Sequence, residues 1–279
     1  MRWHVLAVVV LLSFVGCSAI DGSTETETLT PAPVPTDVPA DGPGATVAPG
    51  VWADGRLDVT VLVDAHRNAV EDRSFVWRET HGRSGETGSI STKVSTYEKI
   101  VYVNDTFFYR DTDEGVNRTN NTLLFYTRYS EYADGTHRYV RAKVFNSEEM
   151  QYNRTPISGD GSRIRNHTVD PVRRYLNVTS VDVRPVTVGG DRYYRLVGTE
   201  LRSMSGGDEW DYSVTATVTP SGLVRNLSAR YTLSNGEENE TFRYRGTFER
   251  LGDVDLEQPN WVQAAENRTA DGTTGSPPT

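Results

Sequence analysis

The chain has 279 residues, a formal net charge of −9 and a single cysteine. One cysteine excludes an internal disulfide framework, so the fold must be stabilised by burial and hydrogen bonding. The acidic excess argues against nucleic acid and anionic lipid headgroups as partners, because neither is attracted to a negative surface.

Residues 1–16 have the pattern of a signal peptide. Arg2 precedes an apolar run at residues 5–15, which is too short to cross a bilayer because a spanning helix needs about 20 apolar residues. The next residues, Phe14-Val15-Gly16-Cys17, resemble a lipobox, the motif of bacterial and archaeal lipoproteins. This resemblance implies that Cys17 becomes the first mature residue and carries the lipid that anchors the protein. An ordinary signal peptide or an uncleaved anchor with a stray cysteine is the alternative.

Residues 17–53 are expected to form a lipidated, Thr/Pro-rich disordered linker. Residues 23–49 contain six prolines and six threonines, with no aromatic residue and no positive charge, a composition that stays solvated. A disordered tail is expected at residues 263–279. Residues 54–262 then remain as a single β-rich domain.

The domain opens with one helical pattern, over residues 58–71. Asp58 can cap its N-terminus, and Leu62, Ala65, Ala69 and Val70 fall on one face. A second, short helix is expected at residues 170–176, because Pro171 suits a first helical turn.

Strand patterns with a period of two occupy most of the remaining domain. The clearest are residues 209–219, 223–233 and 241–251, which predict a three-stranded meander with turns at Pro220-Ser221-Gly222 and Asn235-Gly236. Weaker patterns occur at residues 74–83, 95–103, 106–111, 122–132, 138–145, 178–188 and 192–203.

About ten antiparallel strands and one helix predict a mainly β (α+β) fold. We expect a large curled antiparallel sheet or half-open β-barrel with the N-terminal helix packed on its concave face, since an open twisted sheet would leave a large apolar face in water. The apolar sides of the helix and of residues 209–219 either form ordinary core or line a pocket for an apolar ligand. The candidate pocket residues are Leu62, Ala65, Ala69, Trp210, Tyr212, Val214, Ala216 and Val218.

Nine of the 14 asparagines lie in Asn-x-Ser/Thr sequons, which mark surface positions in secreted chains. Turn-rich β proteins favour these residue types, which could explain part of the excess. The candidate glycosylation sites are Asn104, Asn117, Asn120, Asn153, Asn166, Asn177, Asn226, Asn239 and Asn267.

Motifs for catalysis are missing from the sequence. The five histidines show no paired spacing, and there is no G-x-S-x-G, P-loop or G-x-G-x-x-G pattern. Asp111, Asp113 and Gly115 resemble a calcium loop only weakly, because Thr122 stands where the loop requires glutamate. We therefore expect no enzyme, and we assign no catalytic, cofactor-binding or metal-binding residue.

The order of elements resembles the LolA and LppX type of lipoprotein and lipid carrier, and more closely an uncharacterised lipoprotein family of halophilic archaea. The resemblance rests on the lipobox, the linker, the helix, the meander that includes residues 219–236, and a last strand leading into residues 255–261. It implies a concave face that is covered by helices and holds an acyl or isoprenoid chain.

The balance of charged residues is typical of proteins from salt-loving archaea, because the chain has an acidic excess and only three lysines against 26 arginines. The many arginines within the strands do not fit the entirely apolar cavity that this family pattern would have.

The sequence thus predicts a membrane-anchored extracytoplasmic lipoprotein on the outer side of the cell membrane, held through lipidated Cys17. It would bind or carry a lipid or another hydrophobic ligand. The alternative is a structural or interaction module of the envelope that binds no small molecule.

Overall fold

The computed structural model describes residues 42, 44–87, 90–119, 122–144, 147–157, 162–202, 209–235 and 238–270. These residues belong to one compact unit, Pro39–Thr279. The signal peptide, Cys17 and most of the expected linker lie outside the described residues, so those assignments remain predictions.

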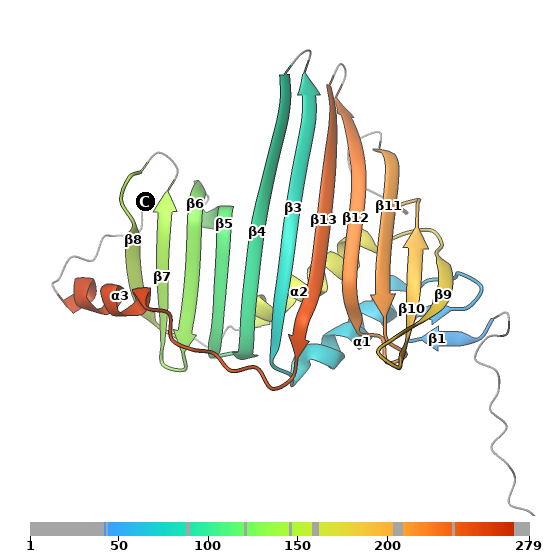
Figure 1. Ribbon diagram of the computed structural model, residues 1–279, viewed down its shortest axis with the longest axis horizontal. Coiled ribbons are helices and arrows are strands. Elements are labelled where there is room, and N and C mark those ends of the chain that lie inside the picture. The colour runs from blue at the N-terminus through green and yellow to red at the C-terminus, as the bar shows by residue number, and fades with distance from the viewer. Residues whose placement is uncertain are drawn as a thin grey trace, which may run out of the picture. The chain divides into compact units, whose positions relative to one another are not determined.

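An antiparallel sheet of eleven strands forms most of the fold (Figure 1). The alternating patterns predicted ten of these strands and missed β8 (Gln151–Pro156). Its strand order is β8-β7-β6-β5-β4-β3-β13-β12-β11-β10-β9, which leaves β8 and β9 at opposite edges of an open sheet. The strands are β3 (Phe75–Thr87), β4 (Ile90–Asn104), β5 (Phe107–Thr119), β6 (Thr122–Asp134), β7 (His137–Val144), β8 (Gln151–Pro156), β9 (Asp182–Val188), β10 (Asp191–Gly198), β11 (Glu209–Val218), β12 (Val224–Asn235) and β13 (Glu238–Leu251).

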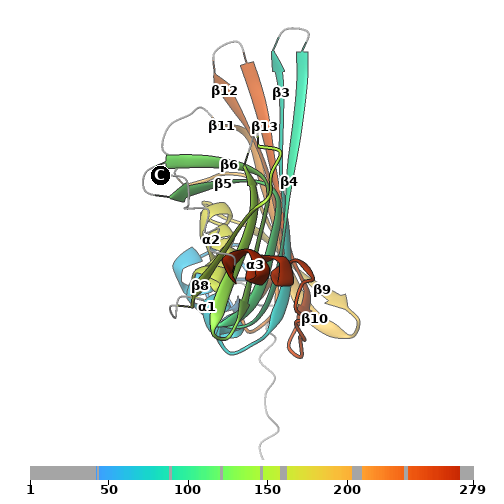
Figure 2. The same ribbon diagram turned by 90° about the vertical axis from the view of Figure 1, so that its left-hand side faces the viewer.

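Two meanders meet at the centre of this sheet. Strands β3 to β8 run outward from the centre to one edge, strands β9 to β13 return from the other edge, and the pairing of β3 with β13 joins them. The connection from β8 to β9 therefore has to pass from one edge to the other. Helix α2 (Ser162–Tyr175) lies in this connection and, with α1 (Val59–Glu71), covers one face of the curved sheet (Figure 2).

Helix α1 begins where its sequence predicted. The Asp58 carboxylate accepts hydrogen bonds from the backbone N–H groups of Thr60 at 3.0 Å and Val61 at 3.2 Å, which satisfies two otherwise unpaired donors. Its inner face buries Leu62, Val63, His66 and Val70. The expectation of an N-terminal helix on the concave face is thus confirmed.

The core lies between these helices and the sheet, in one buried cluster over β10 to β13 and a second over β3 to β6. Leu62 of α1 and Val172 of α2 belong to one buried cluster with the inward side of β11, whose side chains alternate as a half-buried strand requires. Fully burying a side chain of this kind contributes about 1.5–3 kcal/mol, so covering the apolar face stabilises helices and sheet together. The β11 residues in the cluster are Tyr212, Val214, Ala216 and Val218.

His66 is a fully buried polar residue within this packing. Its Nδ1 accepts a hydrogen bond from the backbone N–H of Val224 at 3.1 Å. The ring must therefore be protonated on Nε2, which donates to the carbonyl of Thr168 at 3.2 Å. One neutral imidazole thus links α1, α2 and the start of β12.

The prediction of a short helix starting at Pro171 is wrong. Helix α2 begins nine residues earlier, at Ser162, and contains Pro171 in its interior. The proline removes the donor that would bond the carbonyl of His167. A buried face that includes Ile164, Val169 and Val172 offsets this loss, which the local pattern could not show.

Ordered structure also extends past both predicted domain boundaries. Within the expected linker, β1 (Thr46–Ala48) pairs with β2 (Val51–Trp52). Within the expected tail, α3 (Trp261–Ala270) packs Trp261, Val262 and Ala265 against Tyr132 and Tyr139. Short segments that pack on a larger sheet need no strong pattern of their own, so the sequence did not indicate β1, β2 and α3.

We predict that His66 makes the stability of the fold depend on pH. Burial lowers the pKa of His66 from 6.5 to about 4, although the bond to Thr168 opposes this shift. Its contribution is complete above pH 6.5 and is lost as the pH falls toward 4, by on the order of 3 kcal/mol. Urea unfolding at pH 7, 5.5 and 4 should show this loss in the wild type but not in His66→Gln. The control His137→Gln should retain it, and parallel pH profiles for wild type and His66→Gln would contradict the assignment.

Candidate functional site

A polar pocket of about 350 Å³ lies between α2 and the concave face of the sheet. Pockets that bind small molecules have volumes of about 300–1,000 Å³, so this one is large enough for part of a ligand. Its lining comes from α2, β3 and β13 and comprises Glu79, His81, Arg163, His167, Asp170, Pro171, Arg173, Arg174, Tyr175 and Tyr244.

Strand and helix periodicity together bring these side chains to one place. Glu79 of β3 is the direct partner of Glu98 of β4, so both point to the same face of the sheet. Across from them, Arg163, His167, Asp170 and Arg174 follow one another at spacings of four, three and four residues. One face of α2 therefore projects toward the carboxylates.

Aromatic rings form the apolar part of the pocket. Tyr175 and Tyr244 stack with their ring centroids 4.6 Å apart, and His81 meets Tyr244 edge-on at 5.1 Å. Gly246 makes room for this arrangement, because a Cβ there would overlap the ring of Trp77 and the hydroxyl of Tyr244. The pocket thus borders a stacked, nearly buried pair of tyrosines on one side and charged groups from the helix on the other.

Glu79 is held in place by three donors, although it is almost fully buried. Its Oε2 accepts hydrogen bonds from Trp77 Nε1 at 3.2 Å and from the Tyr244 hydroxyl at 3.1 Å. Its Oε1 lies 3.0 Å from His81 Nε2. A buried carboxylate with this many partners is rigid and orients Tyr244 within the pocket.

Glu98 is the second buried carboxylate of the site. Its Oε2 accepts from Arg110 Nη2 at 2.7 Å and from the Thr112 hydroxyl at 3.1 Å, while Oε1 lies 3.1 Å from His167 Nδ1. Burial by itself would raise the pKa of Glu98, but the contact with His167 and the charge of Arg110 outweigh it and lower the pKa to about 2. Glu98 is therefore ionised under ordinary conditions.

Glu131 fixes α2 to the sheet beside these groups. This carboxylate is completely buried and pairs with Arg163 of α2, with Arg138 Nε of β7 at 2.6 Å, and with the Tyr129 hydroxyl at 3.1 Å. Such partners are required because an unpaired buried carboxylate would be very costly. The network places Arg163 against the wall of the pocket.

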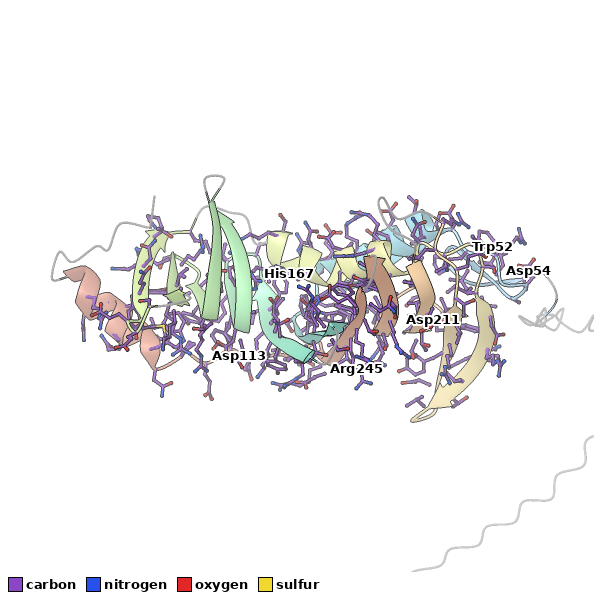
Figure 3. The ribbon with its side chains drawn as sticks, turned by 90° about the horizontal axis from the view of Figure 1, so that it is seen from above. Trp52, Asp54, Asp113, His167, Asp211 and Arg245 are labelled. Atoms are coloured by element: carbon purple, nitrogen blue, oxygen red, sulfur yellow. The ribbon has the colours of Figure 1, made fainter. Side chains whose placement is uncertain are left out.

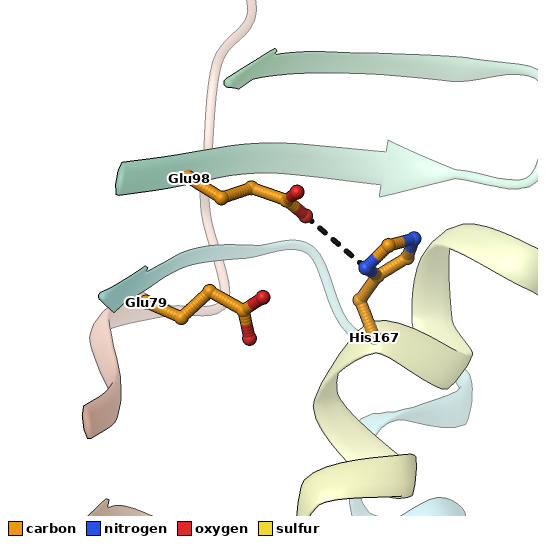
Figure 4. A group of neighbouring side chains, drawn as sticks. All are labelled: Glu79, Glu98 and His167. Carbon is orange, nitrogen blue, oxygen red and sulfur yellow. Dashed lines mark ion pairs between the residues drawn. The ribbon is translucent and has the colours of Figure 1, made fainter. Parts of the chain in front are cut away.

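Glu79, Glu98 and His167 form a cluster in which one potential ligand atom from each lies within 4.8 Å of the others (Figure 4). No sequence pattern indicated this group, because its members come from two strands and a helix and show no spacing motif. Both carboxylates already have donors of their own, and the Arg110 guanidinium occupies one oxygen of Glu98. The cluster is therefore a buried hydrogen-bonded network rather than a preformed cation site.

The candidate pocket residues from the sequence lie elsewhere on the concave face. Leu62, Tyr212, Val214, Ala216 and Val218 are buried in the cluster that contains Val172. Ala65 and Ala69 are half-buried, and the side chain of Trp210 lies outside the described residues. Among the described residues none of them lines the pocket below α2, and their role as ligand contacts stays a prediction.

The sequons occupy varied positions. Asn104, Asn153, Asn166, Asn226, Asn239 and Asn267 are exposed, whereas Asn177 is half-buried. Asn120 and the side chain of Asn117 lie outside the described residues. Modification of each remains a prediction, as does lipidation of Cys17. In the described part of the chain, no helix has the length and apolar character needed to span a membrane.

Comparison with known proteins gives only distant likenesses. No family model matches the chain, and neither does any curated protein. A LolA superfamily protein from Nitrosomonas europaea is 9% identical over 72% of this chain and 96% of its own, with a TM-score of 0.21. A DUF1329 family protein from Desulfovibrio piger is 12% identical over 71% and 95%, with a TM-score of 0.21. A lipoprotein-sorting domain from Vibrio parahaemolyticus is 9% identical over 76% and 97%, with a TM-score of 0.23. Scores this low carry no functional argument.

We predict that Glu98→Gln destabilises the protein by roughly 3 kcal/mol at pH 7, since Arg110 would lose its buried partner. Because the pKa of Glu98 is lowered from 4.5 to about 2, its stabilising contribution is complete above pH 4.5 and is lost as the pH falls toward 2. The difference from wild type should therefore shrink over that range in urea unfolding.

Glu249→Gln is the matched control, because Glu249 pairs with Arg78 on the surface. This change should cost less than about 1 kcal/mol. Equal effects of the two substitutions would show that the Glu98–Arg110 pair contributes no more than an exposed one.

Proposed function

We propose that the protein is a lipid-anchored extracytoplasmic binding protein that holds an amphiphilic ligand in the pocket below α2. The observation that carries this proposal is the combination of stacked Tyr175 and Tyr244 with basic side chains from α2. An amphiphile with an anionic head matches both parts. The protein's own donors engage Glu79 and Glu98, so we propose binding rather than catalysis.

The anchor follows from the N-terminal sequence. Residues 1–16 would be removed as a signal peptide, Cys17 would carry the lipid, and the Thr/Pro-rich segment would hold the domain away from the membrane. The proposed anchor would hold the protein on the outer side of the cell membrane, where the sequons would be accessible for glycosylation. The arrangement agrees with the resemblance to haloarchaeal and LolA-type lipoproteins that the order of elements suggests.

Arg174 is the residue best placed to contact the head of the ligand. It is exposed, its guanidinium lies 5.4 Å from the centroid of the Tyr175 ring, and it makes no ion pair with any described residue. Arg173, by contrast, lies 3.5 Å from Asp170. An anionic group would therefore bind Arg174, while the apolar body would lie along the pocket beside the nearly buried tyrosines.

A second function, an envelope interaction module without a small-molecule ligand, is favoured by a different observation. The inward side chains of β11 are packed against α1 and α2 in a continuous buried cluster. On this reading the concave face serves only as core, and partners bind the outer surface.

We predict that Cys17→Ser abolishes anchoring. The variant should accumulate as an uncleaved precursor or be released into the medium, because the lipid on Cys17 is the proposed membrane attachment. Fractionation with mass spectrometry of the N-terminal peptide measures this. Lipid-free mature variant that still sediments with membranes would count against the anchor.

We predict that Arg174→Glu weakens binding of an anionic amphiphile about tenfold, which corresponds to about 1.4 kcal/mol. The probe is cis-parinaric acid, followed by its fluorescence, with its uncharged methyl ester as the comparison. The ester should bind wild type and variant equally, because it lacks the charge that Arg174 would contact.

Arg250→Glu is the control, since Arg250 is exposed and lies away from the pocket lining. It makes the same charge change and should leave both affinities unaltered. Wild-type protein that binds neither probe, and that yields no lipid when the natively purified protein is extracted for mass spectrometry, would favour the interaction module.

A further inference from the structure

The convex face of the sheet carries a group of arginines on adjacent strands. Arg230 of β12 and Arg243 of β13 are direct cross-strand partners, and Arg245 lies two residues further along β13, opposite Ser228. Since side chains alternate along a strand, all three point to the same face. Each is exposed, and Figure 3 shows Arg245 on the side of the sheet opposite His167.

A hollow of about 360 Å³ lies beside these arginines. Gly82 of β3 pairs across the strands with Arg243 of β13 on one side and with Ser95 of β4 on the other. A position without a side chain therefore lies between Arg243 and Ser95. Three hydroxyls, from Thr80, Ser95 and Ser228, belong to the lining of the hollow. The surface therefore combines positive charge, hydrogen-bonding groups and space.

The three guanidiniums have no carboxylate partner among the described residues. Arg243 donates to the Ser84 hydroxyl at 3.1 Å, and neither Arg230 nor Arg245 makes an ion pair there. Neighbouring arginines do have carboxylate partners: Arg78 lies 2.5 Å from Glu249, and Arg83 pairs with Glu240. Like charges directly across a strand pair are destabilising, and this chain has an excess of acidic residues that could have neutralised them.

We propose that this hollow binds a phosphate or sulfate monoester carried on a sugar-sized molecule. Guanidinium groups bind such oxyanions through paired N–H donors, and three of them can surround the oxygens of one phosphate dianion or sulfate monoanion. The hydroxyls and the space over Gly82 then accommodate the polar body of the ligand. This site lies on the opposite face of the sheet from the pocket below α2, although Tyr244 borders both, and it does not depend on the function proposed for that pocket.

Thermal unfolding at constant ionic strength tests the site, with glucose 6-phosphate as the ester and inorganic phosphate as the free anion. The ester should raise the melting temperature of the wild type in a saturable way, because a ligand that binds only the folded state stabilises it. The double variant Arg230→Gln/Arg245→Gln should lose this response. Its melting temperature without ligand should be unchanged or higher, since a repulsion has been removed.

Two further variants make the result specific. Arg195→Gln removes an exposed arginine from β10, outside the lining of the hollow, and should respond to the ester as the wild type does. Gly82→Leu fills the hollow, and its Cβ meets Arg243 Cβ at an ordinary 3.7 Å, so it should fold and lose the response to the ester.

An equal response of wild type and the double variant, or no response of the wild type, would overturn the site. An equal response of the wild type to inorganic phosphate and to the ester would overturn the sugar-sized ligand.

Discussion

The structure depends on covering one face of an open sheet that is too large to be left in water. Its two edge strands, β8 and β9, are consecutive in the chain, so the segment between them must cross the sheet. Helix α2 lies in that crossing, and α1 packs beside it. One connection thus serves as a topological link, as a layer of the core and as a wall of the pocket.

The covered face is apolar under both halves, and under one half buried ion pairs lie beside the apolar cluster. Val169 and Val172 of α2 pack in the first cluster and Ile164 in the second, whereas Arg163 and His167 meet Glu131 and Glu98. Buried ion pairs contribute little net stability, since desolvation opposes their attraction. Their role here is positional, because a shift of α2 by one residue would leave carboxylates unpaired at high cost. The two apolar clusters supply the stability, and the ion pairs fix where the helix lies.

The parts of the fold that the sequence predicts are those that depend on local pattern. Alternation indicated the strands, and a carboxylate before an apolar stripe indicated the start of α1 at Asp58. Local pattern failed at Pro171, because burial against the sheet overrides the preference of proline for a first turn. It also could not reveal the contact of Glu79, Glu98 and His167, which needs the register of β3 with β4 and the path of α2. Such contacts are properties of topology rather than of spacing.

The many arginines in the strands have different roles on the two faces of the sheet. Their number did not fit the entirely apolar cavity that the resemblance implied. On the concave face, Arg110 and Arg138 neutralise carboxylates that would otherwise be buried alone. On the convex face, Arg230 and Arg245 have solvent on one side and no carboxylate partner among the described residues. A guanidinium suits both roles, because it stays charged when partly buried and presents several donors in a plane. The same residue type therefore closes a network where α2 covers the sheet and leaves donors for an external anion where no helix lies over it.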